Sequence, residues 1–84
     1  MSRWEIDLRY DRKLAEGDIR YLEVIRLAHP EVGYLRHRDK DGALVVTVET
    51  QASTREEAVA LAMVQSKQLW VHAQPVDAKV AADP

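Results

Sequence analysis

The sequence predicts a small α+β domain in which four strands and two helices follow the order βαββαβ. Apolar and polar residues alternate strictly over residues 4–10, which is typical of a half-buried strand. Apolar residues recur with the helical period over residues 19–28 and again after residue 53. A turn sequence at residues 39–42 separates two further strand-like segments. Right-handed crossovers then place both helices on one face of a four-stranded antiparallel sheet, the ferredoxin-like arrangement.

The first strand is predicted over residues 4–10. Its alternation separates an apolar face from a charged face, which are Trp4, Ile6, Leu8 and Tyr10 against Glu5, Asp7 and Arg9. Asp18 is a suitable N-cap for the first helix, because its carboxylate can accept from free amides of the first turn. Pro30 ends that helix, since the residue before a proline is pushed out of the α region.

The second strand is predicted over residues 32–39 and the third over residues 43–50, joined by a hairpin turn. In the second strand Leu35 and His37 share one face. The other face of the two strands is expected to be open to solvent, with Tyr34, Arg36, Arg38, Val45, Thr47 and Glu49. The Leu and Val residues over 44–48 indicate that the third strand is central in the sheet.

The second helix is predicted to begin with a capping box, formed either by Ser53 and Glu56 or by Thr54 and Glu57. Residues 70–76 are predicted as a fourth strand, which Pro75 restricts to an edge, or partly as a continuation of the helix. In the alternative fold this last segment is helix or loop. The domain is thus expected to span residues 1–76, followed by a flexible tail over residues 77–84.

The apolar residues that fall on one face of each predicted strand and helix predict a hydrophobic core. It consists of Trp4, Ile6, Leu8, Leu22, Ile25, Val46, Val48, Leu61 and Leu69. Leu27 and Val64 fall on the polar sides of their helices, and Val45 falls on the open sheet face. We predict that these three contribute to an interface, because a chain of 84 residues without cysteine has little stability in reserve. The expected partner is a second copy in a C2 dimer, with another protein as an alternative.

The composition excludes several classes of function. A net charge of −2 offers no overall attraction to nucleic acid or acidic membranes. The open positions of the predicted central strands carry acids and no aromatic ring, unlike RNA-recognition domains of the same topology, so we expect no nucleic-acid binding. No apolar run approaches the ~20 residues of a membrane helix. The absent cysteines and absent signal-peptide pattern favour a cytoplasmic protein that binds no membrane.

No motif for a cofactor, metal or catalytic constellation is present in the sequence. The three glycines are dispersed, and so are His29, His37 and His72, so no metal site and no cofactor are expected. The one local charge bias is Arg36, His37 and Arg38 with Lys40, beside Tyr34. It is either a solvated edge strand or a patch for an anion or a partner.

Three functions are consistent with these patterns. The first is a non-enzymatic interaction module that self-associates. The second is a sensing or regulatory domain that holds a small anion between subunits, with Arg9, Arg36 or Arg38 as ligands. The third is a small dimeric enzyme with His37 or His72 as a general base. The missing site chemistry favours the first.

Overall fold

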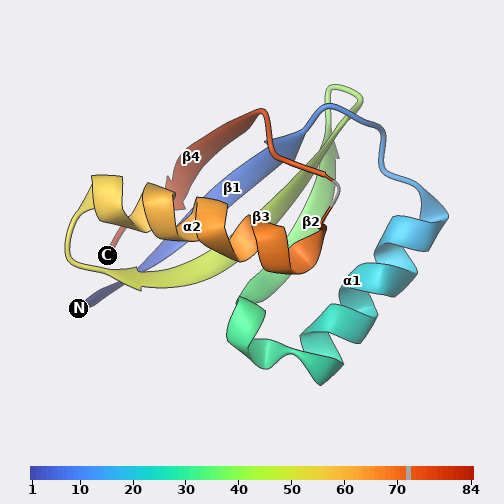
Figure 1. The fold of residues 1–84 in the computed structure, drawn as a ribbon. Coiled ribbons are helices and arrows are strands. Elements are labelled where there is room, and N and C mark those ends of the chain that lie inside the picture. Colours follow the sequence, from blue (N-terminus) through green and yellow to red (C-terminus); the bar gives the residue numbers. More distant parts are fainter. Residues whose placement is uncertain (72) are drawn as a thin grey trace.

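The computed structural model describes residues 1–71 and 73–84 of the chain. Four strands and two α-helices follow the predicted βαββαβ order, with a short 3₁₀ helix after the first α-helix (Figure 1). The elements are β1 (Ser2–Tyr10), α1 (Glu16–Ala28), η1 (Pro30–Val32), β2 (Tyr34–Lys40), β3 (Ala43–Ala52), α2 (Arg55–Leu69) and β4 (Asp77–Ala82). Within the described ranges, no helix has the length and apolar character needed to cross a membrane.

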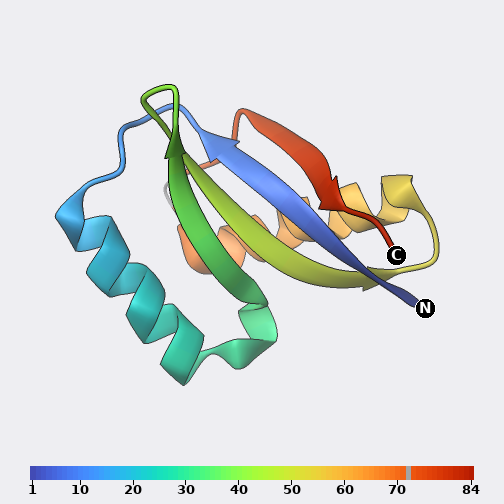
Figure 2. The same cartoon turned by 180° about the vertical axis from the view of Figure 1, so that it is seen from behind.

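The strands form one antiparallel sheet in the order β2-β3-β1-β4, which confirms the predicted α+β class. Helix α2 contacts β3, β1 and β4, whereas α1 contacts β2 and η1. Figure 1 accordingly shows α2 across the sheet and α1 beside β2. Figure 2 shows the opposite sheet face, which neither helix covers. We call it the open face.

The fourth strand lies at Asp77–Ala82, so the predictions of a strand over residues 70–76 and of a flexible tail from residue 77 are wrong. The Trp70 amide donates to the Ser66 carbonyl and closes α2. The buried Pro75 follows, and the Val76 amide donates to the Arg9 carbonyl at 2.7 Å before the strand begins. The prediction for His72 lies outside the described residues. Small side chains make the β4 pattern weak, because alanine has low strand propensity.

The helices begin near their predicted residues, but only one of the predicted caps is correct. Helix α1 begins at Glu16, so Asp18 is not the N-cap but the third helical residue. Its carboxylate accepts from the Ala15 amide at 2.9 Å, which satisfies a free donor ahead of the helix. In α2 Thr54 is the N-cap, because its Oγ1 accepts from the Glu57 amide at 3.2 Å. The Glu57 carboxylate accepts from the Ser53 amide at 3.3 Å and not from that of Thr54, so neither predicted capping box is complete.

The core lies between the helices and the sheet, and seven of the nine predicted core residues are buried. Trp4 is only partly buried, with its indole N–H donating to the Ala52 carbonyl. Leu61 is 39% exposed, so its assignment to the core is wrong. The buried side of α2 follows a different row of positions, which are Ala58, Ala62, Ser66 and Leu69. Alanines in that row let the helix lie close to the sheet, and Leu61 falls outside it.

The connection from η1 to β2 is held tightly against β3. Gly33 has φ +79°, and a Cβ at this position would lie 2.5 Å from the Glu49 carbonyl oxygen. The Glu49 amide donates to the Gly33 carbonyl at 2.7 Å. Gln65 Nε2 of α2 donates to both the Val32 and the Glu49 carbonyls. Only glycine combines this left-handed backbone with so close an approach.

Candidate functional site

The predicted cluster of Tyr34, Arg36, His37 and Arg38 is divided between the two faces of the sheet. Tyr34 pairs with Val48, but Arg36 pairs with Thr47, so β2 gains a residue relative to β3 between these two pairs. Such a bulge reverses the side to which later residues point. The prediction that Tyr34 lies on the open face is therefore wrong. It is 6% exposed and belongs to the core.

Tyr34 and His37 lie together on the helical side. The Tyr34 hydroxyl is 2.7 Å from His37 Nδ1, and their rings are stacked. The Arg26 guanidinium of α1 lies 4.7 Å from the centre of the Tyr34 ring, and it also donates to the Leu35 carbonyl. Burial raises the pKa of Tyr34. This cluster fastens α1 to β2, and one His37 ring nitrogen is already engaged there.

Arg36 and Arg38 lie on the open face and form ion pairs that cross β3. Arg36 donates to Glu5 at 2.7 Å, and Arg38 donates to Asp7 at 2.8 Å. The second Asp7 oxygen accepts from Thr47 Oγ1 at 2.5 Å. Both arginines are thus part of the sheet's own charge network, which the spacing along β2 alone did not predict. They are not a charged edge that only solvent contacts.

Val45 lies on the open face as predicted but is only 2% exposed, so it is not available as an interface residue in this structure. Arg9 and Arg38 are its neighbours on the two flanking strands. Their long side chains can cover apolar surface while the charged ends stay in water. Leu27 and Val64 are 82% and 56% exposed, as their helix positions predict. They belong to the two helices, whereas Val45 lies on the sheet face that the helices leave uncovered.

A hollow of about 220 Å³ lies on the open face near the β2–β3 hairpin. Its floor includes Val45, and four cationic side chains from three strands surround it, which are Arg9, Arg38, Lys40 and Lys79. Three acidic side chains complete the lining. The alternation of β1 and β2 predicted Arg9 and Arg38 on this face. Lys79 lies in the segment predicted as a flexible tail, so the sequence did not predict it in this site.

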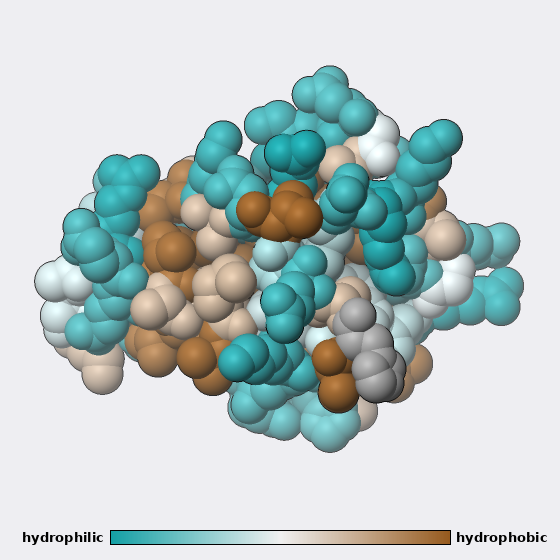
Figure 3. All heavy atoms as spheres, turned by 45° about the horizontal axis from the view of Figure 1, so that its top comes forward, coloured by the Kyte–Doolittle hydropathy of each residue, from teal (hydrophilic) through white to brown (hydrophobic). Residues whose placement is uncertain are grey.

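The outer edge of β4 is a second feature that the sequence analysis missed. Val80 and Ala78 are partly buried against the core, as is Val59 of α2, while Leu61 is exposed. Figure 3 shows apolar side chains gathered on its left-hand side, over the first half of α2 and the neighbouring strand. The side of β4 that pairs with no other described strand therefore lies beside a group of apolar side chains.

In the part of the chain that the structure describes, no three His, Asp or Glu side chains lie close enough together to hold a metal ion. His29 lies on the surface with its Nδ1 3.1 Å from Glu31. His72, one of the two histidines considered as a general base, lies outside the described residues. In comparisons with protein-family models, curated proteins and solved structures, nothing matches this chain.

Proposed function

We propose that this domain is a small non-enzymatic interaction module that self-associates through the outer edge of β4. The observation that carries the proposal is the character of that edge. β4 pairs with β1 on one side, and no other strand among the described residues pairs with its second side. The backbone groups on that side are free to extend the sheet into another chain.

The two edges of the sheet differ in their protection against pairing. β2 carries four charged residues among seven, and charged edges discourage pairing with another strand. β4 carries one residue of each sign, Asp77 and Lys79, and its other residues are three alanines and a valine. A chain of this size also gains stability by burying apolar surface on a partner. These properties favour β4 over β2 as the contact.

The β4 sequence is complementary to itself in one antiparallel register. With a two-fold axis at Ala78, Asp77 of each copy lies opposite Lys79 of the other, so two ion pairs form across the axis. Both residues lie on the open face, opposite Arg9 and Asp7 of β1. In the same register Val80 comes opposite the exposed Val76. Cross-strand pairs of opposite charge and of apolar residues each stabilise a sheet. The register thus supports a C2 dimer with a continuous eight-stranded sheet.

The test is sedimentation equilibrium of the full chain at tens of micromolar, where we expect a species of twice the 9.6 kDa chain mass. Lys79→Asp places like charges opposite one another and should shift the protein to monomer. The double variant Asp77→Lys with Lys79→Asp restores opposite charges and should restore the dimer. Lys40→Asp makes the same charge change on the other edge strand and serves as the control.

The possible outcomes test the oligomeric state and the location of the contact on β4 separately. A wild-type protein that sediments as monomer throughout would contradict self-association. A dimer that Lys79→Asp leaves intact would show that the contact lies elsewhere. Circular dichroism of each variant establishes that it is folded before its mass is interpreted.

A further inference from the structure

We propose that the hollow on the open face binds a small oxyanion, with Arg9 and Lys40 as its principal ligands. The class is a carboxylate or a phosphate carried on a small molecule. This inference goes beyond the proposed self-association. It does not depend on it, because the two ligands belong to β1 and β2 and both come from one chain.

The strand pairing places the ligands in register. One row across the sheet contains Arg38, Val45, Arg9 and Asp77, each paired with the next. Two arginines therefore flank one valine, on strands whose spacing puts their backbones roughly 10 Å apart. Lys40 stands two pairs nearer the hairpin on the same strand as Arg38, opposite Ala43. The three cationic groups approach one small volume from two sides.

The charges around the hollow do not cancel within the molecule. Arg38 is paired with Asp7, whose other oxygen is held by Thr47. Lys79 lies 3.5 Å from Asp77. No ion pair joins Arg9 or Lys40 to another described residue, and the one remaining acid of the lining is Asp41 in the hairpin turn. The hollow thus has two uncommitted cations against one uncommitted acid.

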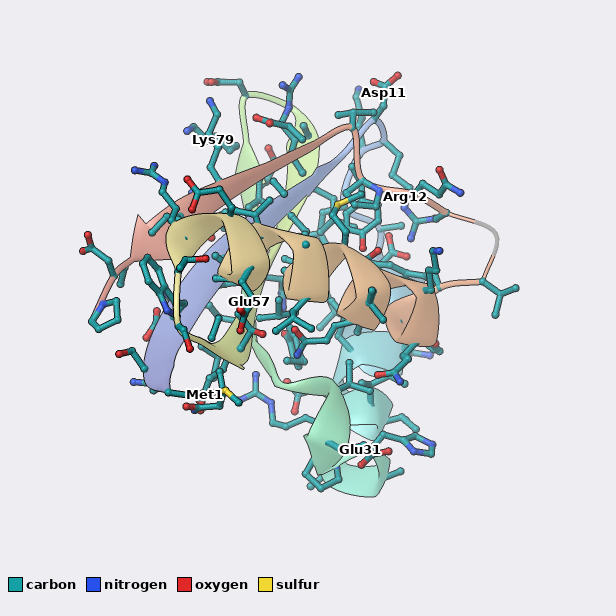
Figure 4. The ribbon with its side chains drawn as sticks, turned by 60° about the vertical axis from the view of Figure 1, so that its left-hand side comes forward. Met1, Asp11, Arg12, Glu31, Glu57 and Lys79 are labelled. Atoms are coloured by element: carbon teal, nitrogen blue, oxygen red, sulfur yellow. The ribbon has the colours of Figure 1, made fainter. Side chains whose placement is uncertain are left out.

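Shape and chemistry agree on the kind of ligand. A guanidinium presents parallel N–H donors that match the two oxygens of a carboxylate or phosphate. A volume of about 220 Å³ lies below that of sites for drug-sized ligands, so the ligand is small. Val45 lines the hollow but is only 2% exposed, so the charged side chains provide most of the surface that a ligand would contact. Figure 4 shows Lys79 and Asp11 at the hairpin end of the sheet, far from Glu31 beside α1.

The experiment follows backbone amide NMR signals of the full chain while sodium phosphate, sodium butyrate or sodium chloride is added at matched ionic strength. We expect saturable shifts at residues 9, 38, 45 and 77 in the millimolar range with phosphate or butyrate, but not with chloride. Saturation by phosphate alone identifies a phosphoryl ligand, and saturation by butyrate identifies a carboxylate on an apolar body.

The variants are Arg9→Gln, Lys40→Gln and Arg9→Lys, each compared with Arg55→Gln. The control removes one exposed cation from the start of α2, on the helical side of the sheet. Loss of one charge-assisted contact should weaken binding about tenfold in Arg9→Gln, while Arg55→Gln should bind as the wild type does. Arg9→Lys should be intermediate, because it keeps the charge but loses the paired donors.

Two results would overturn the proposal. One is a set of shifts that increase linearly and equally with all three salts, because that pattern reports ionic strength alone. The other is saturable binding that Arg9→Gln and Lys40→Gln leave unchanged. Amide signals of the variants away from the hollow report whether each is folded. Since binding is observed spectroscopically at the hollow, a protein that proves monomeric can still pass this test.

Discussion

Replacing Tyr10 by Phe removes a buried hydroxyl and leaves the ring in place. Tyr10 is 1% exposed at the end of β1, and its ring packs edge-on against Trp70 at 5.1 Å between centres. Among the described residues its hydroxyl has no hydrogen-bond partner. In the unfolded chain the same hydroxyl is hydrated, so folding loses that hydration without replacing it.

The expected effect of Tyr10→Phe is stabilisation. An unsatisfied buried hydroxyl costs about 1–3 kcal/mol, and phenylalanine avoids that cost while preserving the aromatic contact. We expect the free energy of unfolding to rise by about 1 kcal/mol, and Tm by about 4–8 °C for a domain of this size. Urea denaturation at neutral pH, followed by circular dichroism, measures the difference directly.

Tyr10→Phe should also change how the free energy of unfolding depends on pH in alkaline solution. Burial raises the pKa of Tyr10 to about 12, with a smaller opposing effect from Arg12. A tyrosine in the unfolded chain ionises near pH 10. Below that pH, the contribution of the raised Tyr10 pKa to the free energy of unfolding is therefore fully present. It is lost as the pH rises towards 12, by about 1.4 kcal/mol per pH unit. Tyr10→Phe should remove the loss of stability that Tyr10 causes at high pH. The pKa of Tyr34 is also raised, so the loss of stability due to Tyr34 should remain in the variant.

Two results would refute this account of Tyr10. If Tyr10→Phe lowers the stability by about 1 kcal/mol or more, the hydroxyl has a strong hydrogen bond in solution. If wild type and variant lose stability equally between pH 10 and pH 12, Tyr10 does not keep its proton in the folded state.

Two further pairs of variants test the packing. Leu69→Ala should cost about 2–5 kcal/mol because Leu69 is fully buried, whereas Leu61→Ala should cost less than about 1 kcal/mol; equal losses in urea denaturation would show that α2 is rotated. Gly42→Ala should cost about 1 kcal/mol for its left-handed backbone alone. Gly33→Ala should cost clearly more, because the added Cβ also meets the Glu49 carbonyl; a thermal melt in which the two variants match would contradict that close approach.

The order of elements along the chain and most of the core could be predicted because they rest on the periodicity of long, regular segments. Ile6 and Leu8 on β1, with Val46 and Val48 on β3, share one face without interruption. In β2 the same reasoning failed at a single point. The bulge before Arg36 is a property of pairing between two strands, so the composition of one strand does not reveal it. That shift alone moved Tyr34 from the predicted binding patch into the core.

The candidate site could be predicted only in part, for a related reason. The alternation of β1 and β2 placed Arg9 and Arg38 on the open face, but the ion pair between Arg38 and Asp7 depends on side chains that reach across β3. Lys79 and the whole β4 edge were missed because a strand of alanines has little apolar periodicity. β4 takes its position because the second side of β1 is free to pair with a strand. That depends on the tertiary structure and not on the sequence of β4 itself.

The unequal burial of the two helices has a consequence for local unfolding. Helix α1 buries only Leu22 and Ile25, whereas α2 buries four side chains. Segments with few buried apolar contacts open at lower free energy than the rest of a domain. The amide protons of α1 should therefore exchange with deuterium before those of α2 and β3. Each opening of α1 exposes the helical side of β2, with Tyr34 and His37, to water while every strand pair stays intact.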